Sequence, residues 1–319
     1  SFGDKFSTKA LAKYAYYVTR YVNNDETQIH VDNTYRQQEM YFSTSNVYEI
    51  LSKWSVSMSY DFKWNKLNAN MVDFAFPHRY SNFVSLATAL TLSRIQAQAS
   101  LVEQVVKDHV KYGASSSSRS TLTPAFFVNV YPFESKLLAV KAFAKKSFRM
   151  PTFNDLYYAD MGNSKLNPES ALQYDLGFVL NKDWKQGIVD HFRLQVDGYY
   201  STVHDKIVAS PKGQQFRWTM LNLGKVHIKG VDAMAEVGLE PAKDWKVTAR
   251  LQYTYQDACD VTDSNTSYYK DQIPYIPWHS GSAILSLSWR ELDLAYSFIY
   301  SGERYSQQEN ILYNHLQPW

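Results

Sequence analysis

The stretch WSVSMSYDFKW, which occupies Trp54–Trp64, decides the fold class of this chain. Its apolar and polar residues alternate without interruption from one end to the other. A period of two places successive side chains on opposite faces of a β-strand. The same alternation recurs in Phe192–Asp197, Trp245–Gln256 and Leu292–Tyr300. The sequence therefore predicts an all-β protein whose strands have one apolar and one polar face.

Strand length distinguishes two architectures that share this alternation. Strands of about 9 to 11 residues suit a tilted crossing of a bilayer, whereas strands of globular proteins average about 5 or 6 residues. The polar faces carry Lys, Arg, Asp and Gln, as expected for a wall with lipid on one side and water on the other. A soluble β-sandwich is the alternative. We predict an antiparallel transmembrane β-barrel, with about 13 strands in this chain.

The connections between the predicted strands alternate between short and long. Short turns are expected in Asn181–His191 and Ser288–Leu294, and long loops in His204–Gly230 and Leu251–His279. Outer-membrane barrels carry short turns on one rim and long loops on the other. Tryptophans lie beside three short turns, where an aromatic girdle is expected, namely Trp184, Trp245 and Trp289. The sequence thus predicts which ends of the strands form the outer rim.

The segment Val84–Ser118 allows two interpretations. Alternating residues run through Val84–Leu92 and again through Ile95–Leu101, but no Gly, Pro or Asn separates the two runs. One interpretation is a sharp turn near Arg94 between two strands. The other is a helix in the second half, because Leu101, Val102, Val105 and Val106 also fit a helical stripe.

Charge and composition exclude several other classes of protein. The formal net charge is only +2, which gives no electrostatic reason to expect a nucleic-acid partner. The single cysteine, Cys259, excludes an internal disulfide framework and a multi-cysteine metal cage. No segment approaches the roughly 18 consecutive apolar residues of a membrane helix. The mean hydropathy of -0.41 is compatible with a barrel, whose strands are apolar only at alternate positions.

A second stretch, SFRMPTFNDLYYADMGNSKLNPESALQYDLGF at Ser147–Phe178, carries a family resemblance. Two predicted strands flank a long insert rich in aromatic and polar residues. The run resembles a strand, outer loop and returning strand of the TonB-dependent outer-membrane receptors, most closely their cobalamin and siderophore types. The residues that match the family pattern are Phe148, Arg149, Pro151, Leu156, Tyr157, Gly162, Asn163, Leu166, Pro168, Glu169 and Gly177.

The resemblance implies how the chain relates to a complete receptor. Such receptors have an N-terminal plug domain inside a barrel of about 22 strands. Residues 1–319 are therefore expected to form one incomplete barrel domain. The plug domain and the last strands of the barrel are expected to lie outside these residues.

The function implied by the resemblance is active import across the outer membrane of a Gram-negative bacterium. Outer loops capture a scarce, bulky nutrient such as a corrinoid or a ferric siderophore, and TonB supplies energy through the plug region. Outer-membrane lipid is a further expected partner, and the resemblance allows a surface lipoprotein. No enzymatic activity is expected. The alternatives are a passive porin, a haem receptor and a barrel hydrolase; the insert has no histidine between Phe148 and Glu169, which counts against haem.

Aromatic and basic side chains in the expected outer loops are the candidate ligand contacts, because they suit a ligand with flat apolar faces and polar edges. Each could equally serve in loop packing. The candidates are Tyr157, Tyr158, Trp218, Tyr268, Tyr269, Arg304 and Tyr305. Three further residues, Asp257, Asp260 and Asp263, could bind Ca²⁺ in an outer loop if their carboxylates converge. Solvated loop acids are the alternative, and no other cofactor is expected.

Overall fold

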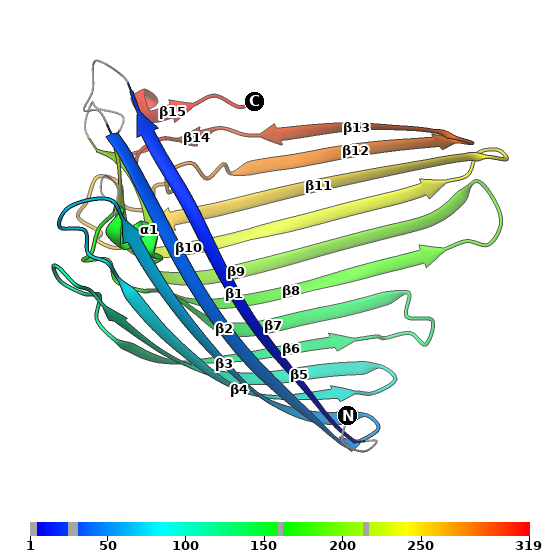
Figure 1. The fold of residues 1–319 in the computed structure, drawn as a ribbon. Coiled ribbons are helices and arrows are strands. Elements are labelled where there is room, and N and C mark those ends of the chain that lie inside the picture. Colours follow the sequence, from blue (N-terminus) through cyan, green and yellow to red (C-terminus); the bar gives the residue numbers. More distant parts are fainter. Residues whose placement is uncertain (1–4, 25–30, 159–161, 213–216) are drawn as a thin grey trace.

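The chain forms one large antiparallel β-sheet. The structure is a computed structural model that describes residues 5–24, 31–158, 162–212 and 217–319, and the side chains of residues 210–218 fall outside this description. The sheet contains 13 strands that follow one another in chain order, so the predicted fold class is confirmed (Figure 1). The strands are β1 (Phe6–Asn23), β2 (Val31–Leu51), β3 (Trp54–Ala69), β4 (His78–Thr91), β5 (Ile95–His109), β6 (Arg119–Val130), β7 (Leu138–Arg149), β8 (Glu169–Asp183), β9 (Val189–Lys212), β10 (Arg217–Leu239), β11 (Trp245–Asp260), β12 (His279–Trp289) and β13 (Leu292–Ser301).

Small elements outside the sheet lie at the rim that carries the long loops. They are the helix α1 (Phe153–Tyr157), the short 3-10 helix η1 (Leu312–Asn314), and the strand pair β14 (Arg304–Tyr305) and β15 (His315–Leu316). No helix in the described part of the chain is long and apolar enough to cross a membrane.

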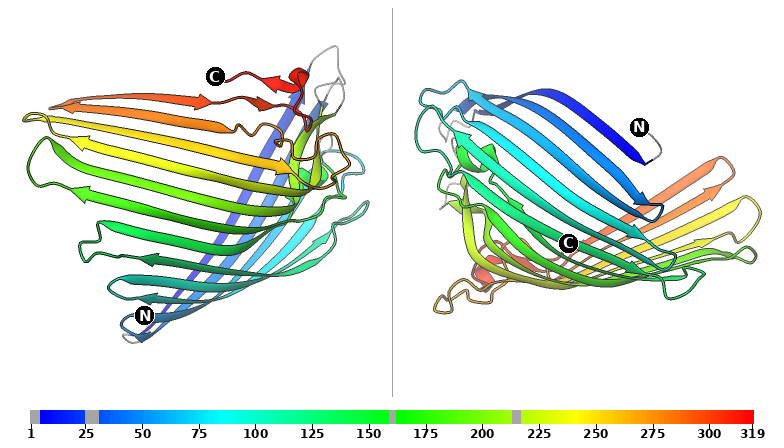
Figure 2. Two further views of the ribbon diagram at one scale, coloured as in Figure 1. Left: turned by 180° about the vertical axis from the view of Figure 1, so that it is seen from behind. Right: turned by 90° about the horizontal axis from the view of Figure 1, so that it is seen from below.

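The sheet is strongly curved and leaves a wide hollow on its concave side (Figure 2). Strand β1 crosses in front of the later strands in the view of Figure 1, so the two edges of the sheet face each other across the hollow. Within the described residues, β1 pairs only with β2 and β13 pairs only with β12. The chain therefore forms an open part of a barrel wall.

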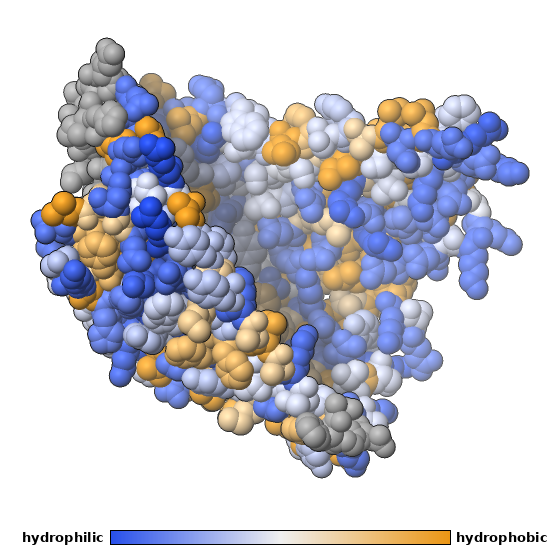
Figure 3. Space-filling view, viewed as in Figure 1, coloured by the Kyte–Doolittle hydropathy of each residue, from blue (hydrophilic) through white to orange (hydrophobic). Residues whose placement is uncertain are grey.

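The period-two alternation places apolar residues on the convex face. Met58 and Leu294 belong to the apolar sets of β3 and β13, and they are 53% and 55% exposed. In a β-sandwich these side chains would be buried between two sheets. Hydrophilic residues dominate the concave face at the right of Figure 3, whereas apolar residues gather on the outer side of β1–β4. The sandwich alternative is therefore wrong.

Ion pairs join strands on the concave face, two of them between the neighbours β1, β2 and β3 and one from β7 across β8 to β9. Glu39 accepts contacts from Lys63 at 2.9 Å and Lys13 at 3.6 Å, and Lys141 contacts Asp197 at 2.8 Å. These residues alternate with the apolar residues of the convex face. Partly buried charges need partners, and the cross-strand register supplies them. The inner face of the wall is thus polar and internally paired.

The Val84–Ser118 segment forms two strands. β4 and β5 pair along almost their whole length, from His78 opposite His109 to Thr91 opposite Gln96. A tight turn joins them, and the backbone N–H of Leu92 donates to the carbonyl of Ile95 at 2.8 Å. The predicted turn near Arg94 is confirmed and the helical interpretation is wrong.

The predicted long loop in His204–Gly230 is also wrong in its described part. β9 and β10 continue as a paired hairpin as far as Lys212 opposite Arg217. The reason is burial on the inner side of this hairpin, where Val203, Leu223 and Val226 pack with Ala258 and the loop residue Ile273. This apolar surface supports strand pairing well beyond the point where the polar sequence suggested a loop.

Candidate ligand-binding rim

The Ser147–Phe178 insert folds back onto the inner side of the wall at the long-loop rim, where α1 lies across the opening (Figure 1). A capping box begins the helix. The Thr152 hydroxyl accepts a hydrogen bond from the N–H of Asp155 at 3.2 Å, and the Asp155 carboxylate accepts one from the N–H of Thr152 at 2.8 Å. This arrangement satisfies N–H groups that have no partner within the helix. Arg149, at the end of β7, contacts the same carboxylate at 3.2 Å.

A buried arginine from β4, three strands away from β7 in the sheet, holds the start of the insert. Arg79 of β4 donates to the carbonyl of Pro151 at 2.7 Å, and its guanidinium lies over the ring of Phe153 at 5.1 Å. Two further hydrogen bonds, at 2.7 and 2.6 Å, join Arg79 to Asp108 of β5. Pro151 itself is almost fully buried. Sequence reasoning missed both Arg79 and Asp108.

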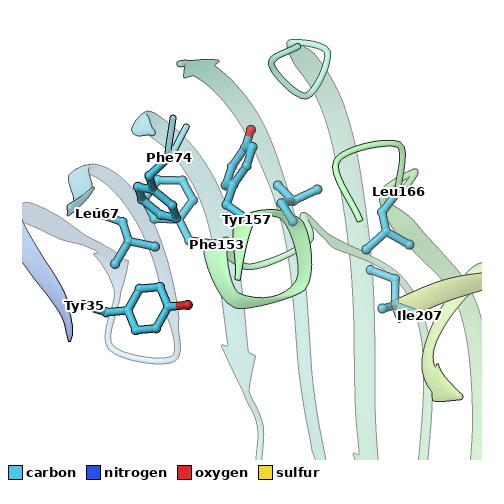
Figure 4. Close-up of a cluster of buried hydrophobic side chains, with 8 residues drawn as sticks. Tyr35, Leu67, Phe74, Phe153, Tyr157, Leu166 and Ile207 are labelled. Atoms are coloured by element: carbon cyan, nitrogen blue, oxygen red, sulfur yellow. The ribbon is translucent and has the colours of Figure 1, made fainter. Parts of the chain in front are cut away.

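An apolar cluster anchors the rest of α1 (Figure 4). Its buried members come from elements far apart in the sequence. Phe153, Leu156 and Tyr157 of the helix meet side chains from β2, β3, the β3–β4 connection, the end of the insert and β9, namely Tyr35, Leu67, Phe74, Leu166 and Ile207. Burial of this apolar surface is the main force that keeps the helix inside the rim.

The two tyrosines predicted as ligand contacts have structural partners here. Tyr157 is 8% exposed, and its hydroxyl accepts a hydrogen bond from the N–H of Ser116 at 3.4 Å. Tyr158 stacks on Tyr35 with 4.2 Å between ring centroids. Burial raises the pKa of both phenols above the ordinary value, because the charged phenolate is disfavoured away from water. They form part of the support of the rim as well as part of its surface.

The second half of the family motif fixes the return of the insert to β8. The amide of Asn163 donates to the carbonyl of Met220 in β10 at 3.0 Å, and Leu166 is buried in the apolar cluster. Glu169 accepts a hydrogen bond from the N–H of Ile207 at 3.0 Å. At Gly162 a Cβ would lie 2.7 Å from backbone atoms of Tyr157 and Tyr158, so only glycine fits. These motif residues thus have roles in folding the insert.

Two cavities lie beside α1, near its opposite ends. The cavity near the C-terminal end has a volume of about 320 Å³ and lies between the β3–β4 connection, the β5–β6 connection and the insert. Tyr157 and Tyr158 line it together with Phe74, Tyr112 and Ala114. We call it the outer cavity. Its aromatic walls and exposed backbone suit a ligand with apolar faces and polar edges.

The cavity near the N-terminal end has a volume of about 300 Å³ and is lined mainly by polar and charged side chains. Side chains of the concave face line it, among them Gln37, Lys63, Asn65 and Arg79, and Asn154 of α1 completes it. We call it the inner cavity. The helix α1 is therefore placed between a surface accessible at the rim and the polar interior of the wall.

Four of the five remaining predicted contacts lie in a second cluster formed by the β11–β12 connection and the segment after β13. Tyr305 packs against Trp278 and His315, with ring centroids 5.8 and 5.6 Å apart. Arg304 donates to the carbonyls of Gly302 and Gln317. Tyr268 and Tyr269 are half-buried in the same connection. Trp218 lies in β10, but its side chain falls outside the described residues.

The three candidate calcium ligands have separate partners. Asp257 contacts Lys229 at 3.0 Å, Asp260 accepts a hydrogen bond from the N–H of Thr262 at 2.9 Å, and Asp263 accepts one from the N–H of Asn265 at 2.9 Å. In the described ranges, no three His, Cys, Asp or Glu side chains are grouped so that they could hold a metal ion. The calcium site stays a prediction.

A curved antiparallel wall with an apolar outside, a polar inside and a folded insert at its rim defines a barrel of the receptor class. The sequence matches the family described as "TonB dependent receptor-like, beta-barrel" over residues 1–318. The chain belongs to this family.

Solved structures and curated relatives agree with this assignment. The fold is similar to that of the copper transporter OprC, with a TM-score of 0.71, 15% identity, and coverage of 99% of this chain and 52% of the other. The FrpB iron transporter from Neisseria meningitidis gives a TM-score of 0.70 with 12% identity, and coverage of 98% and 52%. The vitamin B12 transporter BtuB of Vibrio vulnificus (strain YJ016) is 28% identical over 120 residues, which are 37% of this chain and 17% of the relative.

The chain is thus similar to only part of each of these proteins. It spans about half the length of the solved structures, and the aligned segment covers 17% of the Vibrio relative. A vitamin B12 transporter BtuB from Photobacterium profundum is 32% identical over 104 residues, which are 31% of this chain and 16% of the relative.

Proposed function

We propose that this chain is the wall of an outer-membrane receptor that binds a scarce, bulky nutrient, a corrinoid or a ferric siderophore, and imports it with energy supplied by TonB. The outer membrane of a Gram-negative bacterium is the proposed location. The exposed apolar convex face supports this location, because such a face is stable only against lipid. The proposed role is binding and passage without enzymatic chemistry.

The observation that carries the proposal is the position of α1 between the outer and inner cavities. This helix is held firmly in place by Arg79, by a capping box and by a buried apolar cluster, so the outer cavity beside it is a preformed binding surface. A ligand in the outer cavity would contact Tyr157, Tyr158 and Tyr112. Flat aromatic walls favour a macrocyclic or aromatic ligand. The similar proteins include a vitamin B12 transporter and an iron transporter, which supports the same class of nutrient.

Binding to the complete receptor in detergent tests the proposal. The probes are cyanocobalamin, a ferric catecholate, a ferric hydroxamate and haemin, each titrated by isothermal calorimetry. We expect saturable binding of one of the first three. Substitution Ala114→Trp places an indole in the outer cavity and should weaken that binding about tenfold. The matched control is Ala242→Trp in the short β10–β11 turn, which should leave the affinity unchanged.

Uptake into cells separates a receptor from a pore. Accumulation of the bound nutrient should saturate and should stop when the gene for TonB is deleted. Uptake that continues at the same rate without TonB would contradict active import and favour a passive channel. If Ala114→Trp and Ala242→Trp change the affinity equally, the outer cavity is not the binding site.

A further inference from the structure

The convex face of β7–β11 carries a groove that the proposed nutrient site does not use. The groove has a volume of about 560 Å³ and is almost wholly apolar. It lies over Gly198, where the absence of a side chain opens a gap in the apolar surface. Outward-facing side chains of the neighbouring strands form its sides, namely Tyr174, Leu176, Tyr200, Val231 and Tyr255. Leu176 is 63% exposed, so this surface is available to a partner.

The strand register arranges the surroundings of the groove in layers. Its floor is the row in which Leu176, Gly198, Val231 and Tyr255 lie opposite one another. The next row toward the long-loop rim contains Tyr174, Tyr200, Lys229 and Asp257. Toward the long-loop rim, the apolar groove is therefore followed by a row that contains two tyrosines and the charged residues Lys229 and Asp257.

The rows beyond the tyrosines are basic. Thr202 pairs with His227 and with Leu172, which in turn pairs with Lys146, and His204 pairs with Lys225 in the row above. Lys146 and Lys225 form no ion pair with any residue that the structure describes, and Lys229 has Asp257 as its partner. Asp257 is the one acidic residue in these described rows. The convex face above the groove thus carries unpaired positive charge.

The rise of the strands from the short-turn rim, where the tryptophans lie, places this charge at the opposite interface of the membrane. Trp245 and Trp289 stack at the short-turn rim, with 5.5 Å between their ring centroids. From Trp245 to Asp257, strand β11 rises about 30 Å if it is tilted like other barrel strands. The apolar band of such barrels is about 25 Å tall. The groove therefore lies at the outer edge of the apolar band, and the lysines lie at the level of lipid head groups.

We propose that this surface binds a phosphorylated, acylated lipid of the outer leaflet. One acyl chain would occupy the groove over Gly198, and the phosphates would lie at the level of Lys146, Lys225 and His227, with Lys146 three strands away from the other two. Two features favour this occupant. The unpaired lysines complement the negative charge of a phosphate, and they lie at the membrane depth of the lipid head groups. A second copy of the chain would place these like charges against each other. The inference depends on the proposed membrane location, but it is independent of the nutrient.

Native mass spectrometry of the complete receptor tests the lipid site. The probes are bis-phosphorylated lipid A, the same lipid after removal of its phosphates, and phosphatidylethanolamine, each added to delipidated receptor in detergent. We expect one phosphorylated lipid A to be retained preferentially. Loss of both lysines in Lys146→Gln/Lys225→Gln should lower its retention by about fivefold or more. The matched control Lys243→Gln, in a short turn at the other rim, should have no effect.

Filling the groove provides a second, independent variant. A Cβ at Gly198 would have only the carbonyl oxygen of Leu176 nearby, at 3.8 Å, so Gly198→Leu is compatible with folding. It should abolish selective retention, whereas Ala233→Leu on the same face of β10 should not. Equal retention of dephosphorylated lipid A, or unchanged retention in both variants, would overturn the proposal, as would a dimer that depends on Gly198.

Nutrient binding measured on the same preparations distinguishes the two proposals. Gly198→Leu and Lys146→Gln/Lys225→Gln should retain the affinity of the unmodified receptor for its nutrient. Loss of lipid selectivity with normal nutrient binding is the expected result for these variants. Failure of the nutrient titrations together with normal lipid selectivity would contradict the proposed nutrient function alone.

Discussion

Arg79 and Asp108 form a two-bond ion pair across β4 and β5, and the same arginine holds the carbonyl of Pro151. The Asp108 side chain is fully buried, and that of Arg79 is 11% exposed. Charges in such a position are tolerated because each polar group has a partner. This pair connects the barrel wall to the insert that divides the outer cavity from the inner cavity.

Removal of the arginine should release the insert. In Arg79→Ala the Asp108 carboxylate stays buried without its partner, which costs about 3 to 5 kcal/mol for pairs of this kind. We expect a lower urea midpoint for the complete receptor in detergent and faster proteolysis near Tyr157. The double variant Arg79→Met/Asp108→Leu removes both charges and should recover much of the global stability. Equal destabilisation by the single and double variants would contradict a role for the unpaired charge.

The capping box makes a smaller contribution that can be measured separately. Thr152→Ala removes the side chain that accepts from the N–H of Asp155 and should cost about 1 kcal/mol. The same measurement on Asp155→Ala and on the double variant forms a mutant cycle. Because the two side chains act together, the sum of the single effects should exceed the effect of the double variant. Strict additivity would argue against the capping box.

Much of the fold could be predicted because it depends on local pattern. The alternation in Trp54–Trp64 identified a strand and both of its faces, and the tryptophans identified the short-turn rim. The length of the β9–β10 hairpin could not be predicted. The sequence around Pro211 has the composition of a loop, and the burial of Val203 and Val226 depends on Ala258 and Ile273, which lie far away in the sequence.

The location of the candidate site could be predicted from the sequence, but the contacts that hold it together could not. The family motif marked the insert correctly, yet it gave no sign that Arg79 and Asp108 would hold it. Which face a charged residue occupies follows from alternation, whereas its partner follows from the register of strands that are paired over long distances. For the same reason the sequence marks Tyr157 as a candidate ligand contact but does not show that it also packs in a cluster with Phe153 and Leu156.

The close approach at Gly162 predicts that even a methyl group will disturb the insert. In Gly162→Ala the new Cβ would lie 2.7 Å from the backbone N–H nitrogens of Tyr157 and Tyr158, and backbone atoms cannot move as a flexible side chain can. We expect a loss of about 1 to 3 kcal/mol in unfolding free energy and weaker nutrient binding. Gly198→Ala is the matched control, because its Cβ meets only open space and one carbonyl oxygen at 3.8 Å. Similar effects of the two substitutions would contradict the predicted contact.

The buried phenol of Tyr157 predicts a specific alkaline sensitivity. Burial raises the pKa of this group, so the folded rim holds the proton more tightly than the unfolded chain does. The resulting stability is complete below the unfolded value of about 10 and is lost as the pH rises above it. The thermal unfolding temperature of the complete receptor should therefore fall more steeply between about pH 9 and pH 11 than that of Tyr157→Phe. A parallel loss of stability in Tyr157→Phe and the unmodified receptor over this range would contradict the prediction. It would mean that the phenol of Tyr157 ionises as freely in the folded rim as in the unfolded chain. The burial of Tyr157 beside the outer cavity would then be wrong.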